Sequence, residues 1–187
     1  MRLFLALELD PRERRAICRA TAPMRTAASE ASWVSEGNLH LSIKFFGEQP
    51  DTAPAELTVL LSSVGRAHQP FDLRLSGLGA FPNLRAPRVV WMGVQQDPRL
   101  ELVHHDVEAA CAANAYPLEA RAFRPHITLA RVRQPLPLAS ARALALAARA
   151  VVYKGVQQVN ALSLIESTLG PGGPRYTKVV SIPLGGG

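Results

Sequence analysis

Two tetrapeptides of this sequence share one pattern of residue types: a histidine, an aliphatic residue, a hydroxyl residue and a second aliphatic residue. They are His40-Leu-Ser-Ile43 and His126-Ile-Thr-Leu129, which lie 86 positions apart, one in each half of the chain. Each falls in a segment whose composition predicts a β-strand. Because strand side chains alternate between two faces, each histidine shares a face with the hydroxyl two residues later, and the aliphatic residues point toward a core.

An imidazole and a hydroxyl from each of two strands would suit in-line displacement at phosphorus, if the strands met across a cleft. Such a displacement needs a base for the attacking water and an acid for the leaving oxygen, on opposite sides of the phosphate. Histidine can serve in either role because its unperturbed pKa is about 6.5. The hydroxyls of Ser42 and Thr128 could donate to the non-bridging oxygens. The sequence offers no carboxylate cluster for a metal, so we expect neither a metal nor another cofactor.

Strand and helix patterns alternate along the whole chain. We expect helices where apolar residues recur at 3.6-residue spacing and strands where they alternate or form short apolar runs. The predicted strands are 2–9, 38–46, 71–78, 88–94, 127–132, 156–166 and 176–182, and the predicted helices are 12–29, 54–68, 99–115 and 138–150.

The composition excludes several classes of protein. Of the 187 residues, 48% are hydrophobic and 19% are charged, which allows a sizeable core and argues against wholesale disorder. The two cysteines, Cys18 and Cys111, cannot build a disulfide framework or a zinc motif, as is typical of a protein in the reducing cytoplasm. No apolar run is long enough for a membrane span. The net charge of +6 suits an anionic partner such as nucleic acid, although an arginine-rich genome would give the same balance.

Beyond the tetrapeptides, most of the chain resembles one known family. The sequence is similar to the two-histidine (2H) phosphoesterases, and within them to the bacterial RNA 2′,3′-cyclic phosphodiesterases, first described as 2′–5′ RNA ligases. Ser42 departs from the family pattern, which usually has threonine there, but the hydroxyl is retained. The segments that carry the resemblance are 2–7, 33–48, 79–82, 88–93, 123–131, 164–167 and 173–177.

The resemblance implies an α+β fold in which residues 1–187 form one domain of two intertwined lobes. Antiparallel sheets from two pseudo-symmetric halves would form a concave central cleft with helices outside, and residues 185–187 would be a flexible tail. His40 would be the general acid that protonates the leaving O3′, and His126 the general base that activates water. The product would be a 2′-phosphomonoester, and the reverse reaction would join a 5′-hydroxyl to a cyclic end without ATP.

Several further residues are candidates for contacting RNA. Alternation places Phe46 on the face of His40, and either Phe46 or its neighbour Phe45 could stack on a base. Arg131 could meet a phosphate or simply be an exposed residue at a strand end. Tyr176 could reach the cleft or pack in the core.

The expected partner is RNA with 2′,3′-cyclic phosphate ends, such as tRNA fragments, with no obligate protein partner and no membrane. Two alternatives stay open, because the motifs recognise only the phosphate. The protein could act on another small cyclic nucleotide or on a 2′–5′ linkage, or it could bind RNA ends without turnover.

Overall fold

The computed structural model describes residues 1–171 and 173–185 of the chain. In this part of the chain, nine antiparallel strands form one sheet. The helices are α1 (Pro11–Ala20), α2 (Ala22–Ala27), α3 (Ala53–Ala67), α4 (Pro98–Ala113) and α5 (Leu138–Ala150), with one 3-10 turn, η1 (Glu36–Asn38). The strands are β1 (Arg2–Glu8), β2 (Ser32–Trp33), β3 (His40–Glu48), β4 (Phe71–Phe81), β5 (Val89–Val94), β6 (His126–Arg131), β7 (Lys154–Val159), β8 (Ala161–Gly170) and β9 (Gly173–Pro183).

Eight of the nine strands form two four-stranded halves of the sheet, which meet at the two histidine strands. The strand order is β7-β4-β5-β6-β3-β1-β8-β9, and the short β2 pairs with β6. The halves are therefore joined where β6 lies beside β3. This joint is narrow, because Leu41 and Ile127 are the single residue pair that the two strands share in the described part of the chain.

The chain crosses between the two halves near its C-terminal end. The sequence patterns predict one strand over 156–166, and this prediction is wrong. In the structure β7 ends at Val159 and pairs with β4, whereas β8 begins at Ala161 and pairs with β1 in the other half. Periodicity cannot reveal such a crossing, because both segments carry strand-like residues and only their partners differ.

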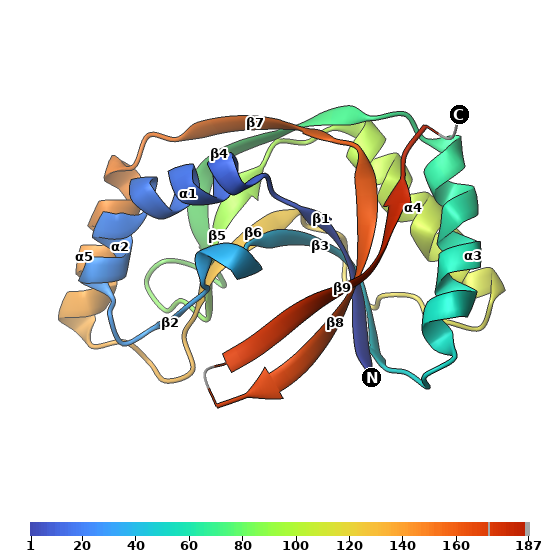
Figure 1. The fold of residues 1–187 in the computed structure, drawn as a ribbon. Helices are drawn as coiled ribbons and strands as arrows, with labels where there is room; N and C mark the ends of the chain where they lie inside the picture. Colours follow the sequence, from blue (N-terminus) through green and yellow to red (C-terminus); the bar gives the residue numbers. More distant parts are fainter. Residues whose placement is uncertain (172, 186–187) are drawn as a thin grey trace.

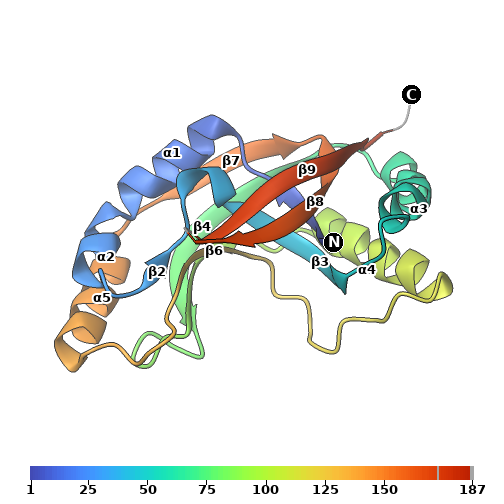
Figure 2. The ribbon, with the colours of Figure 1, turned by 60° about the horizontal axis from the view of Figure 1, so that its bottom comes forward.

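The helices lie at the two ends of the sheet (Figures 1 and 2). Helices α3 and α4 pack on each other and on the half that contains β3, β8 and β9, while α2 and α5 pack on each other at the opposite end. In α3, Leu57, Leu61 and Val64 recur at helical spacing and are buried, and Leu60 is partly buried against the same core. The main core beneath them also includes the aliphatic residues of both histidine tetrapeptides.

This architecture confirms the predicted α+β class with an antiparallel sheet. None of the helices in the described residues is long and apolar enough to cross a membrane. The expected flexible tail at 185–187 lies outside the described residues, except for Gly185.

Candidate active site

The two histidines lie on neighbouring strands at the joint between the halves. His40 is the first residue of β3 and His126 the first residue of β6. Their neighbours Leu41 and Ile127 form the antiparallel pair of the joint, and both are fully buried. The histidines therefore project from the opposite, open face of the sheet. Continuing the register by one residue sets His40 beside Thr128, so each imidazole has the other strand's hydroxyl as its cross-strand neighbour.

Both imidazole rings are oriented in the same way by the backbone that precedes them. The Nδ1 atom of His40 lies 2.7 Å from the carbonyl oxygen of Asn38, and that of His126 lies 2.6 Å from the carbonyl oxygen of Arg124. A carbonyl oxygen can only accept, so Nδ1 carries the proton in each ring and Nε2 is free for chemistry. The Nε2 atom of His40 lies 3.1 Å from the hydroxyl oxygen of Ser42.

Aromatic side chains hold each imidazole in place. Tyr176 of β9 meets His40 edge-on, with ring centroids 5.3 Å apart, and Phe4 packs on the same imidazole at 4.9 Å. On the other strand, Phe81 meets His126 edge-on at 5.1 Å. Tyr176, which the sequence left between cleft and core, thus lies against a candidate catalytic ring. It is only partly buried, and its pKa is raised mainly by that burial.

The surroundings of His40 favour its neutral form. Burial lowers the pKa of His40 from its usual value of 6.5, and the positive charges of Arg14 and Arg131 add to this effect. The carbonyl of Asn38 and the carboxylate of Glu8 act in the opposite direction without cancelling it. In the free protein near neutral pH, His40 is therefore mostly unprotonated.

Each histidine strand contains a β-bulge that turns the residue five positions after the histidine toward the open face of the sheet. The register of β3 against β1 shifts at Ile43, and that of β6 against β5 shifts at Leu129, so both strands carry an extra residue three positions after the histidine. The register of β3 shifts a second time, at Phe46. The burial patterns of the two strands then agree over their first six residues. After the bulge, Phe45 and Arg131 are the exposed residues at equivalent positions.

The bulge corrects the prediction for the two phenylalanines. Phe45 is 55% exposed on the open face, where it packs beside Phe4, whereas Phe46 is 9% exposed in the main core and meets Tyr116 edge-on. The prediction that Phe46 lies on the face of His40 is therefore wrong. Simple alternation fails here because a bulge places two successive residues on one side of the strand.

Arg131 lies close enough to the site to affect it electrostatically. Its charge contributes to lowering the pKa of His40 and opposes the rise in the pKa of Tyr176. The side chain is exposed at the end of β6. Arg131 is thus a cation near the imidazole of the neighbouring strand, free to meet an anion.

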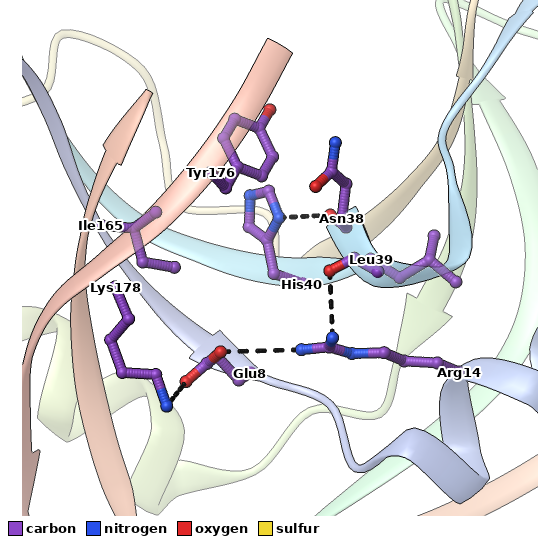
Figure 3. A pocket seen from close by; sticks show the side chains of 9 residues that line it. Glu8, Arg14, Asn38, Leu39, His40, Ile165, Tyr176 and Lys178 are labelled. Carbon is purple, nitrogen blue, oxygen red and sulfur yellow. Dashed lines mark hydrogen bonds and ion pairs between the residues drawn. The ribbon is translucent and has the colours of Figure 1, made fainter. Parts of the chain in front are cut away.

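A pocket beside His40 contains charged residues that the sequence analysis missed (Figure 3). The carboxylate of Glu8 lies 2.6 Å from the ammonium of Lys178 and 3.7 Å from the guanidinium of Arg14, which also donates to the carbonyl of Gly37. Burial acts to raise the pKa of Glu8, but the hydrogen bonds from Lys178 and Ser163, together with the positive charges of Lys178 and Arg14, outweigh it and lower the pKa. No local motif marks these residues, because they come from β1, α1 and β9 and meet only in the fold.

Within the described residues, no group of three histidine, cysteine or acidic side chains is arranged to hold a metal ion. The site instead offers two imidazoles whose Nε2 atoms are not held by the backbone, a hydroxyl beside each, and a nearby arginine. This arrangement can accept a proton on one side of a phosphate and donate one on the other.

Known proteins are similar to this chain in sequence and in fold. The family model of the 2′-5′ RNA ligase superfamily matches residues 13–170. The chain belongs to this superfamily. The match confirms the resemblance inferred from the two histidine motifs and their flanks.

Two curated relatives and one solved structure show how far the likeness extends. The RNA 2′,3′-cyclic phosphodiesterase of Geobacillus stearothermophilus is 31% identical over 97% of this chain, although the chain spans only 56% of that relative. The protein of the same name from Methanothermobacter thermautotrophicus is 30% identical over 95% of both chains. The crystal structure of a Thermus thermophilus protein, TT0787, superposes with a TM-score of 0.81, at 30% identity, over 100% of this chain and 99% of that one. The similarity to this solved structure thus extends over the whole fold described above.

Proposed function

We propose that this protein hydrolyses the 2′,3′-cyclic phosphodiester at the end of an RNA chain and leaves a 2′-phosphomonoester. The observation that carries the proposal is the pair of identically held imidazoles on neighbouring strands, each with Nδ1 bonded to the carbonyl two residues earlier. Relatives of similar length named RNA 2′,3′-cyclic phosphodiesterase support this substrate class.

In the proposed reaction, His126 accepts a proton from water as its oxygen attacks phosphorus. The bond from phosphorus to O3′ breaks, and His40 gives the proton from its Nε2 atom to that oxygen. The hydroxyls of Ser42 and Thr128 donate to the non-bridging oxygens, where negative charge grows in the transition state. An RNA 5′-hydroxyl that attacks in place of water would pass through the same steps in the same direction, give its proton to His126, and form a 2′–5′ linkage without ATP.

The direction of the reaction fits the asymmetry between the two halves. The leaving O3′ belongs to the ribose, so the nucleoside must lie on the side of the acid, and water must enter on the side of the base. The half that carries His40 has Phe45 as a mostly exposed aromatic side chain, with Phe4 beside it and Tyr176 packed edge-on against Phe4. The equivalent position in the other half is Arg131. These contrasts support a nucleobase stacked on Phe45 and a phosphate bound near Arg131.

Because its pKa is lowered, His40 must gain a proton before it can act as the general acid. A cyclic phosphodiester carries one negative charge, and an anion beside an imidazole favours the protonated form. Substrate binding is therefore expected to raise the pKa of His40, so that the acid becomes charged in the complex. Tyr176, packed edge-on against this ring, would keep it aligned with O3′.

The test is to incubate the protein with a short RNA that ends in a 2′,3′-cyclic phosphate, in excess EDTA, and to identify the product. A 2′-phosphate formed at an undiminished rate, and lost in His40→Ala and His126→Ala, is expected because both proton transfers are made by side chains. A requirement for a divalent ion, or binding without turnover, would refute the proposal. Cyclic mononucleotides, 2′–5′ dinucleotides and cleaved tRNA in parallel reactions would define the preferred substrate.

A further inference from the structure

A lysine lies buried directly behind the active-site face of β3. Lys44 is only 1% exposed, and its ammonium group lies 2.6 Å from the Oε1 atom of Glu108 in α4 and 2.8 Å from the carbonyl oxygen of Pro117. Burying two charges costs desolvation energy, and an apolar pair of similar volume would be about as stable. The stability of the core therefore does not account for this pair.

The pair connects β3 to the segment that leads to the second histidine. Residues 114–125, between α4 and β6, contain no helix or strand. Lys44 binds this segment through Pro117, and the Oε2 atom of Glu108 accepts a hydrogen bond of 2.9 Å from the backbone N–H of Glu119. The carboxylate of Glu119 in turn accepts a 3.1 Å hydrogen bond from the backbone N–H of Phe45. The connections thus begin and end on β3.

Strand pairing alone does little to fix the position of β6 against β3. Among the residues that the structure describes, the two strands share only the pair Leu41–Ile127. Beyond that pair, the segment 114–125 contacts β3 through Lys44, Phe45 and Phe46. The same segment is held to α4 by Phe123, whose ring stacks on His104 at 3.9 Å. It ends with the Arg124 carbonyl that accepts the Nδ1 proton of His126.

We propose that Lys44 is a positioning residue for catalysis. With Glu108, it clamps the segment 114–125 against the strand of His40, and so places the Arg124 carbonyl and the imidazole of His126. This inference rests on the proposed function, because it assigns His126 the base. Removing the clamp leaves the hydroxyls and Phe45 available to bind substrate, so kcat falls far more than KM rises. A displacement of about 1 Å costs on the order of 100-fold in rate.

Two sets of variants test the clamp without relying on one that could fail to fold. Lys44→Met with Glu108→Gln removes both charges together and keeps an acceptor for the Glu119 N–H. Glu119→Ala deletes only the bond to Phe45, and its side chain is exposed. The matched control is His68→Gln with Asp106→Asn, which alters another polar pair, a 2.8 Å contact between the C-terminal end of α3 and α4. In the described part of the chain, that pair makes no hydrogen bond to residues 114–125.

Each variant is assayed for kcat and KM on the cyclic-phosphate RNA, at a temperature where circular dichroism shows it folded. Hydrogen–deuterium exchange, read by mass spectrometry, reports the protection of residues 114–125. We expect kcat to fall about 10- to 100-fold in the charge-removing double variant and about 3- to 10-fold in Glu119→Ala, as for one lost hydrogen bond. In both variants, KM should stay within about threefold of the wild-type value, because ground-state binding of the substrate is kept. Hydrogen–deuterium exchange should rise in residues 114–125 of both variants.

The control should retain both wild-type kcat and wild-type protection of the segment. Unchanged kcat in Glu119→Ala and the double variant, or an equal loss in the control, would overturn the positioning role. If the wild type fails to hydrolyse the RNA, the proposed function fails, and the positioning role fails with it. Unchanged exchange in residues 114–125 would refute the clamp itself, whatever the activity.

Discussion

Adjacent phenylalanines on β3 allow a sharp test of the bulge and of the proposed nucleobase site. Phe45 is 55% exposed on the open face and Phe46 is 9% exposed in the core, although simple alternation predicts the reverse. Replacing each by alanine should therefore produce opposite phenotypes. Phe45→Ala should weaken substrate binding and spare the fold, whereas Phe46→Ala should weaken the fold.

The expected magnitudes follow from burial. Stacking of a base on an aromatic side chain contributes about 1–3 kcal/mol, so Phe45→Ala should raise the Kd for substrate about 5- to 150-fold. Phe45 buries less than half of its surface, and full burial is worth about 1.5–3 kcal/mol, so its loss should lower the free energy of unfolding by about 1 kcal/mol. Phe46→Ala leaves a cavity in the core and should cost about 3–5 kcal/mol.

The assay combines denaturant unfolding with binding of a non-cleaved RNA to His126→Ala protein that carries each substitution. Phe45→Tyr retains a ring for stacking and should bind like the parent, while Phe45→Leu retains bulk without the aromatic face and should bind weakly. Equal binding by the alanine and parent proteins would refute the nucleobase site. A larger loss of stability in Phe45→Ala than in Phe46→Ala would refute the assignment of the two faces.

Three further predictions concern the catalytic groups. Ser42→Ala and Thr128→Ala should each lower kcat by about 10²–10³, with unchanged circular dichroism, and wild-type turnover in both would remove the hydroxyls from the mechanism. Because burial lowers the pKa of His40 below 6.5, kcat/KM should decline with rising pH from below that value, whereas kcat should persist to higher pH because bound phosphate raises the pKa. If kcat/KM and kcat declined over the same range of rising pH, this reasoning would be contradicted. On a substrate with sulfur in place of the leaving O3′, His40→Ala should recover much of its rate, since the thiolate departs without a proton. Recovery by His126→Ala instead would reverse the two roles.

The sequence by itself determined the elements of the site that depend on local periodicity. Alternation within a strand is a property of the strand's own backbone, so the spacing of His40 and Ser42 was enough to set both on one face, with Leu41 in the core. The repetition of this pattern at His126 and Thr128 then predicted a paired site. The helical spacing in α3 likewise identified its buried face.

Only the tertiary structure decided features that depend on what each strand pairs with. The bulges arise from the register of β3 against β1 and of β6 against β5, so neither strand's own sequence shows that Phe45 and Arg131 turn to the open face. Pairing also divided the predicted strand 156–166 between the two halves of the sheet. The charge of Lys44 suggests exposure, but its partner Glu108 comes from a helix 64 residues away and allows it to be buried. Contacts between distant segments decided these features, and local periodicity carries no information about such contacts.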